Sequence, residues 1–189
     1  MSTDTIAFAL HDHNGERTTE TSFPGRHSLV FFGFTNCRTV CPRALDRLQR
    51  TLNLLGDDAV AFQPLYITVD PDRDDEERLR SFLRDRPGIL GLTGTAAELE
   101  ATRRAFHAFA KRKDDAEDPD GYAVPHTALT YVLDDTGHLI AHLGDALTGE
   151  EVADALREVL AGTAPTTVDA ATPTAGHSCP ADCPVGCCS

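Results

Sequence analysis

The sequence predicts an α/β domain with a central mixed sheet, helices on both of its faces and a short cysteine-rich tail. Nearly continuous apolar runs are typical of strands buried on both faces, and segments with helical spacing alternate with them. With 189 residues, 41% hydrophobic and 25% charged, the chain has the composition of one ordinary globular domain.

The N-terminal third begins with an expected β-hairpin. Residues 6–10 and 18–23 are the two strands, and Asn14 and Gly15 supply the turn between them. Residues 28–34, SLVFFGF, follow as a nearly continuous apolar run, which predicts a buried strand.

The next two elements are a helix and a strand. Leucines recur at helical spacing over residues 42–55, with Pro42 in the first turn and Gly56 as the stop signal. Residues 60–69 read as a strand, in which Pro64 predicts a bulge or bend.

Two further helices are expected from capping motifs. Asp74-x-x-Glu77 opens a short helix, and Thr95-x-x-Glu98 opens a longer one with Phe109 on its apolar side. An acidic loop over residues 114–121 comes next.

The C-terminal part of the domain contains two strands and a helix. Residues 126–144 read as two strands joined at 135–137. Thr148-x-x-Glu151 begins the last helix, whose inward face includes Leu160. We therefore expect a domain over residues 1–161, a flexible linker over 162–176 and a cysteine-rich tail over 177–189.

Charge and hydropathy exclude some classes of function. The formal charge is 17 − 30 = −13, so a phosphate backbone would be repelled and nucleic acid is not an expected partner. No stretch approaches the length of a transmembrane segment, and the first residues lack the pattern of a signal peptide. The sequence as it stands predicts a cytoplasmic protein, which we expect to be a monomer. Six cysteines in such a chain favour metal or redox chemistry.

Cys37 and Cys41 lie between a predicted strand and a predicted helix, in the stretch NCRTVCP. We expect Cys41 at the N-cap of the helix that begins at Pro42, where the helix dipole favours the thiolate. Both metal binding and disulfide exchange require a thiolate. The pair is therefore a metal clamp or a redox pair, and buried packing is the remaining alternative.

A histidine would complete a copper site at these thiols. Two thiolates alone leave Cu(I) under-coordinated, and an imidazole would complete a three-coordinate S₂N site. Zinc would require a fourth ligand. His126 is the candidate because it begins a predicted strand directly after Pro125.

Three separated motifs resemble the Sco/SenC family of copper proteins. They are GFTNCRTVCP, ITVDPDRD and YAVPHT, in the order and spacing of that family, and the resemblance covers about residues 6–161. It implies a thioredoxin-like fold in which Cys37, Cys41 and His126 bind one copper ion. It also implies copper delivery to the binuclear copper centre of cytochrome c oxidase, or reduction of that centre's cysteines. The cysteine pair would be able to close to a disulfide.

The sequence departs from the family pattern near each candidate ligand. Pro125 replaces the aspartate that usually precedes the histidine, and it resembles the cis-proline of thioredoxins. Arg38 replaces the proline that commonly follows the first cysteine, and its cation would lower the thiol pKa. The family is usually membrane-anchored and faces the periplasm, and the sequence shows no such anchor.

The residues of the DPDRD motif follow a strand, at the sheet edge where open α/β folds bind ligands. Asp70, Asp72, Arg73 and Asp74 would tune the copper loop, or else they turn the chain and cap the next helix. We favour the structural interpretation.

A second candidate metal or thiol site lies in the tail. Its residues are His177, Cys179, Cys183, Cys187 and Cys188, which would hold zinc or Cu(I) or pair as disulfides. A linker of about 16 residues reaches about 22 Å, enough to return to Cys37 and Cys41. The tail is thus expected to hand metal or electrons to the core site.

The rival function is a thiol-disulfide oxidoreductase. Cys37 would attack a substrate disulfide and Cys41 would resolve the mixed disulfide, with no role for a metal. Partners are accordingly the copper-centre subunit of cytochrome c oxidase or another copper or thiol protein. A peroxidase on the same fold ranks third, because no peroxide pocket is recognisable.

Overall fold

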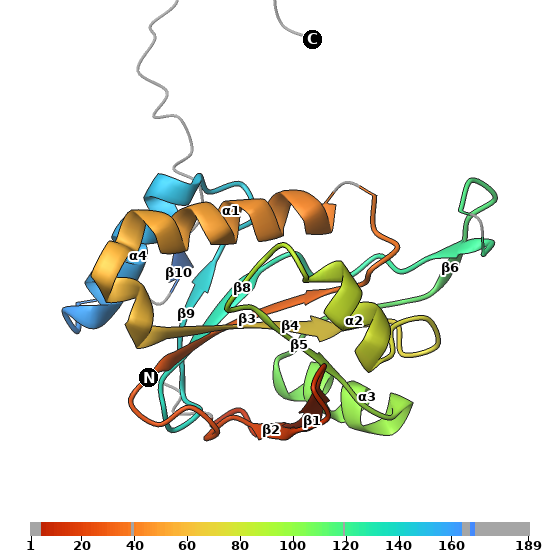
Figure 1. Cartoon of the computed structure of the whole chain (residues 1–189), viewed down its shortest axis with the longest axis horizontal. Helices are drawn as coiled ribbons and strands as arrows, with labels where there is room; N and C mark the ends of the chain where they lie inside the picture. Colours follow the sequence, from red (N-terminus) through yellow and green to blue (C-terminus); the bar gives the residue numbers. More distant parts are fainter. Residues whose placement is uncertain (1–4, 39, 119, 164–166, 169–189) are drawn as a thin grey trace, which may run out of the picture.

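The computed structural model describes residues 5–38, 40–118, 120–163 and 167–168. These form an eight-stranded mixed sheet in the order β10-β9-β8-β3-β4-β5-β1-β2, and a separate two-stranded sheet (Figure 1). The large sheet comprises β1 (Ala9–Asp12), β2 (Arg17–Thr19), β3 (His27–Gly33), β4 (Phe62–Thr68), β5 (Leu90–Thr93), β8 (Thr130–Leu133), β9 (Leu139–Leu143) and β10 (Thr167–Val168). The small sheet pairs β6 (Lys113–Asp114) with β7 (Tyr122–Ala123).

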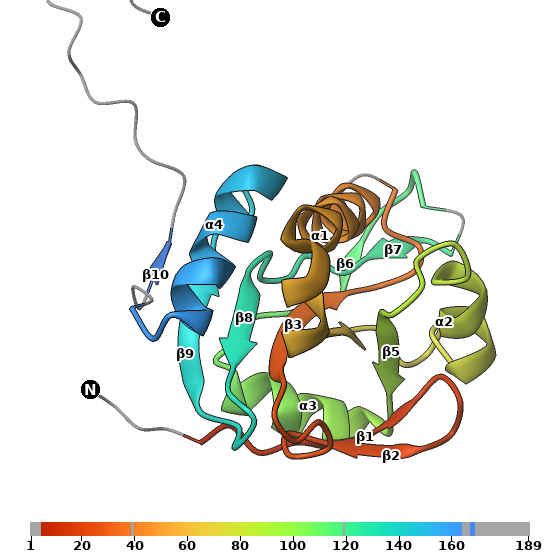
Figure 2. The ribbon, with the colours of Figure 1, turned by 60° about the vertical axis from the view of Figure 1, so that its left-hand side comes forward.

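The helices cover both faces of the large sheet. They are α1 (Val40–Leu55), α2 (Glu76–Phe82), α3 (Ala96–Ala105) and α4 (Gly149–Leu160), and a 3₁₀ turn η1 (Gly56–Ala61) follows α1. Buried side chains of α1, α2 and α4 share one hydrophobic cluster, whereas those of α3 join a second cluster with the N-terminal segment. Figure 2 shows α1 and α4 on one side of the strands and α3 on the other. The predicted arrangement of a mixed sheet between helices is confirmed.

Strand β3 carries the cysteine segment because it lies in the middle of the sheet. It pairs in parallel with β4 and antiparallel with β8. Leu29 and Phe31 point into the cluster under α1, and Val30 and Phe32 point into the cluster around α3. Burial on both faces explains why this strand is a continuous apolar run rather than an alternating one.

The N-terminal hairpin is confirmed, and it has a role in the sheet. β1 pairs antiparallel with β2 through a turn at Asn14 and Gly15, and Gly15 has the positive φ of 88° that favours glycine. β1 also pairs with β5, a strand that sequence reasoning missed. The hairpin therefore extends the sheet beyond β5.

Three local expectations are wrong. Pro64 causes no bulge, because the β3–β4 register is continuous and β5 pairs only with residues 65–67, beyond the proline. Phe109 is exposed, because α3 ends at Ala105 before reaching it. Leu160 is 39% exposed, at the very end of α4.

The C-terminal segment lies mostly outside the described residues. Within the expected linker, Thr167 and Val168 form β10, which pairs in parallel with β9. Residues 169–189, with all five candidate ligands of the tail, are not described. Among the described residues, no helix has both the length and the apolarity that a membrane crossing requires.

Candidate metal and thiol site

The two core cysteines lie where β3 passes into α1, a segment that we call the cysteine loop (Phe34–Arg38). The backbone N–H of Cys37 donates to the carbonyl of Phe34 at 3.1 Å, which turns the chain after the strand. The backbone N–H of Cys41 in turn donates to Cys37 Sγ at 3.4 Å. Cys41 is fully buried and Cys37 is half-buried, so the two sulfurs lie together with only Cys37 near the surface.

The environment of Cys41 differs from our expectation. α1 begins at Val40, so Cys41 is inside the first turn rather than at the N-cap. A hydrogen bond to the sulfur of Cys37, burial and the nearby charge of Cys37 together raise the pKa of the Cys41 thiol, against smaller opposing effects of Phe34 and Tyr66. Burial and the neighbouring sulfur of Cys37 therefore favour the protonated thiol of Cys41 over the thiolate.

A buried carboxylate holds the start of the cysteine loop. Asp74 accepts hydrogen bonds from the backbone N–H of Thr35 at 3.0 Å, from Thr35 Oγ1 at 2.6 Å and from Thr68 Oγ1 at 2.7 Å. Burial raises the pKa of Asp74, and these hydrogen bonds oppose that rise. Asp74 is thus bonded to the ends of β3 and β4.

The expected cap of α2 is therefore wrong by one residue. The N-cap is Asp75, whose side chain accepts from the backbone N–H of Arg78, and this frees Asp74 for the cysteine loop. Arg78 also reaches that loop: it donates to Thr35 Oγ1 at 3.2 Å and to Asn36 Oδ1 at 2.9 Å. One turn of α2 and the residue before it thus fix the residues that precede Cys37.

His126 has one nitrogen engaged and one without a partner. Its Nδ1 is 2.8 Å from the carbonyl oxygen of Val124, so Nδ1 carries the proton and donates it. Its Nε2 is buried and has no hydrogen-bond partner among the described residues. The ring packs edge-on against Phe34, with centroids 5.7 Å apart, and Phe34 is also in contact with Cys37. The His126 ring therefore lies against Phe34 of the cysteine loop, with its Nε2 buried and without a partner among the described residues.

The segment around His126 is less regular than we expect from sequence. His126 forms an isolated bridge with Ala110, and the strand begins only at Thr130. The resemblance of Pro125 to a cis-proline is not confirmed, because no peptide bond among the described residues is cis.

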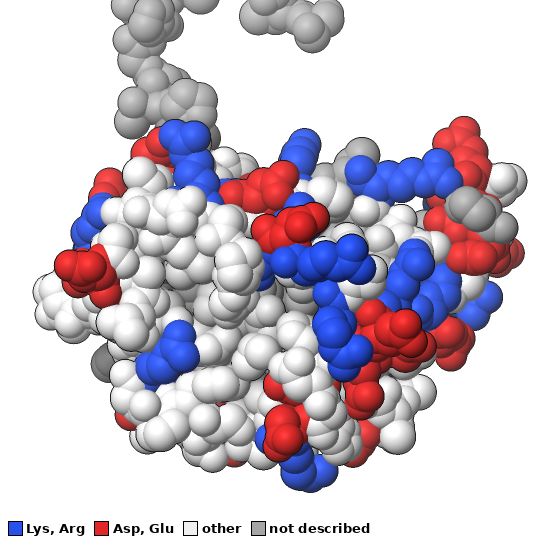
Figure 3. All heavy atoms as spheres, in the orientation of Figure 1, with Lys and Arg blue, Asp and Glu red and all other residues white. Residues whose placement is uncertain are grey.

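An acidic hairpin (residues 113–118 and 120–123) packs beside the cysteine loop. Arg73 forms an ion pair with Asp70, and its Nη1 lies 3.1 Å from Asp118 and 3.3 Å from Asp120. Its guanidinium also lies over the ring of Tyr122, whose hydroxyl donates to Asp70 at 3.0 Å. Figure 3 shows acidic side chains gathered at this end of the molecule.

The cysteine loop itself also contacts this hairpin. Asn36 donates to Asp120 at 2.9 Å, and Arg38 donates to the carbonyl of Glu117 at the same distance. Arg38 is therefore directed to the hairpin backbone. The DPDRD motif, the hairpin and the cysteine loop form one connected network, which leads along the chain from Tyr122 to His126.

The described residues contain no set of three or more histidine, cysteine, aspartate or glutamate side chains placed to hold a metal ion. Cys37 and Cys41 are in contact, and both Cys37 and His126 contact Phe34. The three side chains are nevertheless not placed together as metal ligands. Sequence reasoning also missed Tyr66, whose buried hydroxyl lies in the same hydrophobic cluster as Cys41. The available signal was a hydroxyl in an otherwise apolar strand, PLYITV.

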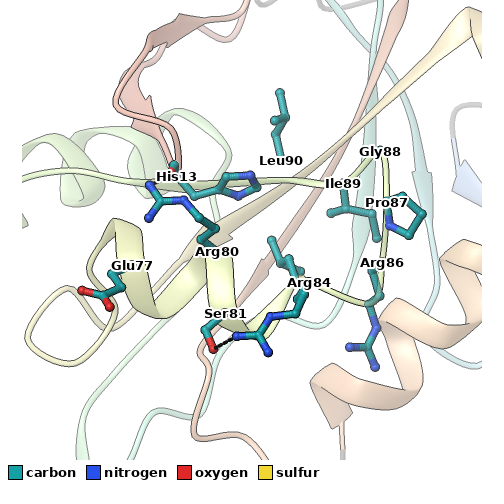
Figure 4. A pocket seen from close by; sticks show the side chains of 11 residues that line it. His13, Glu77, Arg80, Ser81, Arg84, Arg86, Pro87, Gly88, Ile89 and Leu90 are labelled. Carbon is teal, nitrogen blue, oxygen red and sulfur yellow. Dashed lines mark hydrogen bonds between the residues drawn. The ribbon is translucent and has the colours of Figure 1, made fainter.

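A groove of about 570 Å³ lies elsewhere, at the C-terminal end of α2. Figure 4 shows His13, Arg80, Arg84 and Arg86 around it, with Arg84 bonded to Ser81. Arg86 is paired with Asp46, and Arg80 donates to the carbonyl of His13. None of the predicted ligands lines this groove.

Comparison with known proteins identifies relatives over most of the chain. The profile of the SCO1/SenC family matches residues 2–161. The chain is 35% identical over 153 residues to "Protein SCO2 homolog, mitochondrial" of Danio rerio, covering 79% of this chain and 54% of that protein. It is 36% identical over 156 residues to "Protein sco1" of Schizosaccharomyces pombe, covering 79% of this chain and 58% of that protein. The chain thus spans little more than half the length of these curated relatives.

Solved structures with copper resemble this fold. Bradyrhizobium japonicum ScoI with copper bound superimposes with a TM-score of 0.72 at 34% identity, over 80% of this chain and 96% of that one. Yeast Sco1 with copper bound gives a TM-score of 0.76 at 33% identity, over 84% and 89%. The thioredoxin-like fold that the motifs imply is confirmed, and the chain belongs to the SCO1/SenC family.

Proposed function

We propose that this protein binds one copper ion through Cys37 Sγ, Cys41 Sγ and His126 Nε2. The observation that carries the proposal is the buried Nε2 of His126, a lone pair with no partner among the described residues, next to the ring that contacts Cys37. A buried acceptor without a partner is costly, and a metal ion would satisfy it.

The chemistry of the three donors suits copper. Two thiolates and one neutral imidazole form the soft S₂N set that Cu(I) accepts, whereas structural zinc takes four ligands. The hydrogen bond from Nδ1 to Val124 holds the tautomer that leaves Nε2 free for the metal. Because the three donors are not yet assembled, binding requires the cysteine loop and the His126 segment to approach each other.

Copper is the cargo of this site in our proposal. The family resemblance points to delivery of copper to the binuclear centre of cytochrome c oxidase, or to reduction of that centre's cysteines. Two of the solved relatives above hold copper, as their descriptions state.

The second candidate function is thiol-disulfide exchange without a metal. The unequal exposure of the two sulfurs favours it: Cys37 is accessible to a substrate disulfide, and Cys41 is buried directly behind it. Cys37 would attack and Cys41 would release the product by closing the intramolecular disulfide.

A copper titration separates these two functions. We expect the reduced protein to bind one tight equivalent of Cu(I) in the core against a competing chelator. His126→Ala should weaken the binding of that Cu(I) equivalent by at least about tenfold, because one of three ligands is lost. His138→Ala is the matched control, because His138 is half-exposed and bonded to Thr136.

Two results of this titration would contradict the copper proposal. If His126→Ala and His138→Ala bind copper as tightly as the unmodified protein, His126 is not a ligand. If the core binds no tight copper and the thiols still cycle against a disulfide substrate, the protein acts as a reductase.

A further inference from the structure

His13 holds the turn of the N-terminal hairpin against β5 with its ring as well as its backbone. The backbone N–H of Gly91 donates to His13 Nδ1 at 3.0 Å, and the backbone N–H of His13 donates to the carbonyl of Gly91 at 2.8 Å. Because an N–H donates only to a ring nitrogen that carries no proton, the imidazole is neutral, with its proton on Nε2. These two bonds extend the β1–β5 pairing beyond its regular residues, His11 and Asp12.

The ring of His13 approaches β5 closely because Gly91 has no side chain. A Cβ atom at Gly91 would lie 3.2 Å from His13 Nδ1 and 2.9 Å from Leu83 Cδ1, so a larger residue would crowd both neighbours. On the other side, Arg80 of α2 donates to the carbonyl of His13, and Figure 4 shows the His13 ring beside Arg80 at the groove. His13 thus joins the hairpin turn, α2 and β5 at one point.

The charges around His13 come from its own strand and from α2 with the residues that follow it, whereas β5 brings none. The neighbouring charged residues are Asp12, Glu77, Arg80, Arg84 and Arg86. Burial lowers the pKa of His13, and Arg80 adds to this effect, whereas Asp12 opposes it. The ring therefore takes up a proton less readily in the closed hairpin than it would in water.

We propose that the His13 imidazole is a proton-sensitive latch, which holds the hairpin turn on β5 while it is neutral and releases the turn when it is protonated. A proton on Nδ1 removes the lone pair that accepts from Gly91 and places two N–H groups opposite each other. The step adds one proton from solvent to Nδ1 and changes no other covalent bond.

The direction of the pH dependence follows from the lowered pKa of the closed form. Above about pH 6.5, the ordinary value for histidine, both the closed and the open hairpin are neutral and the latch contributes fully. As the pH falls below that value, the open form binds the proton first, so its population grows until the closed form is protonated as well. Release leaves backbone N–H and C=O groups of β5 unpaired at the opened edge.

Native-state hydrogen exchange of the full chain, followed by NMR at the Gly91 amide, tests the latch. Protection factors, which correct for the intrinsic pH dependence of exchange, are compared at about pH 7.5 and about pH 5. We expect the protection of Gly91 to fall about fivefold on acidification, as for the loss of one hydrogen bond. In His13→Asn, Oδ1 replaces Nδ1 as an acceptor that does not titrate, so the protection of Gly91 should be equal at both pH values.

His11→Asn is the matched control. His11 lies on the same strand and pairs with β2 and β5 through its backbone, so this variant should keep the fall in protection at Gly91. The amide of Val30, in the central strand β3, should be equally protected at both pH values. An equal fall in His13→Asn and the unmodified protein, or a fall shared by Val30, would overturn the proposal.

A titration of the His13 ring in the unmodified protein needs no variant. Nitrogen chemical shifts distinguish the two neutral tautomers, and we expect the proton on Nε2 and a pKa below the ordinary histidine value. A proton on Nδ1 at about pH 7.5, or a pKa above the ordinary value, would overturn the latch. None of these readouts involves Cys37, Cys41 or His126, so the outcome is independent of the copper function.

Discussion

At the scale of single residues, the carboxylate of Asp74 connects parts of the chain that are far apart in sequence. Its three hydrogen bonds come from Thr35, which precedes the cysteine pair, and from Thr68, at the end of the next strand. All three donors and the acceptor are buried, so water cannot replace a lost bond. Asp74 is therefore the buried group that fixes the start of the cysteine loop, next to the more exposed contacts of Asn36 and Arg38.

We predict that Asp74→Asn destabilises the protein by about 1–3 kcal/mol. The amide keeps one acceptor oxygen and turns an NH₂ group toward donors, so at least one buried group loses its partner. Urea unfolding of the reduced protein measures the change.

The control for Asp74→Asn is its neighbour. Asp75 caps α2 from an exposed position, and asparagine is an equally good N-cap, so Asp75→Asn should change the stability by less than about 0.5 kcal/mol. Equal effects at the two positions would contradict the role that we assign to Asp74.

At the scale of elements, Arg73 joins the end of β4 to the acidic hairpin. Its side chain is 11% exposed, and those of Asp70 and Asp118 are 5% and 8% exposed. The three charges are thus largely withdrawn from water, and Arg73 pairs with both carboxylates through Nε and Nη1, while its buried Nη2 has no hydrogen-bond partner among the described residues. Since the hairpin leads directly to His126, this network also sets where that histidine lies.

We predict that Arg73→Gln destabilises the protein by about 3 kcal/mol, because it leaves two buried carboxylates without their cation. Arg112→Gln is the control: Arg112 also lies over the ring of Tyr122, but its ion pair with Asp72 is exposed. That change should cost less than about 1 kcal/mol.

Hydrogen exchange locates the effect of the Arg73 change. We expect amides of residues 113–118 and 120–123 to exchange faster in Arg73→Gln than in Arg112→Gln. Loss of protection spread evenly over the whole sheet would mean that Arg73 supports the fold in general and not the hairpin.

At the scale of the whole molecule, the cysteine-rich tail remains a prediction from sequence. Its candidate ligands, His177 to Cys188, follow β10, the last strand among the described residues. We propose that the tail supplies metal or electrons to Cys37 and Cys41 from a high effective concentration.

We predict that truncation after Val168, which retains β10, removes at least one Cu(I) equivalent and leaves the core equivalent intact. It should also slow reloading of the core site from a limiting copper donor. A stopped-flow comparison of full-length and truncated protein measures that rate. Identical stoichiometry and identical rates would show that the tail has no part in either step.

The sequence by itself determined the elements that depend on local pattern. The apolar run of β3, the leucine spacing of α1 and the Thr-x-x-Glu capping boxes of α3 and α4 appear in the structure as predicted. These signals arise within a few residues of one another, so a single segment contains all the information they need. The family motifs likewise identified the cysteine pair and His126 as candidates.

Only the tertiary structure decided which groups lie next to the candidate ligands Cys37, Cys41 and His126. It placed β5 beside the N-terminal hairpin, moved the cap of α2 to Asp75 and gave Asp74 to the cysteine loop. It also left His126 Nε2 without a hydrogen-bond partner among the described residues. The contact of Asp74 with Thr35 joins residues 39 positions apart, and the pairing of β1 with β5 joins residues 80 and 82 positions apart. No local periodicity encodes these contacts, because they arise only when the sheet and its helices pack together.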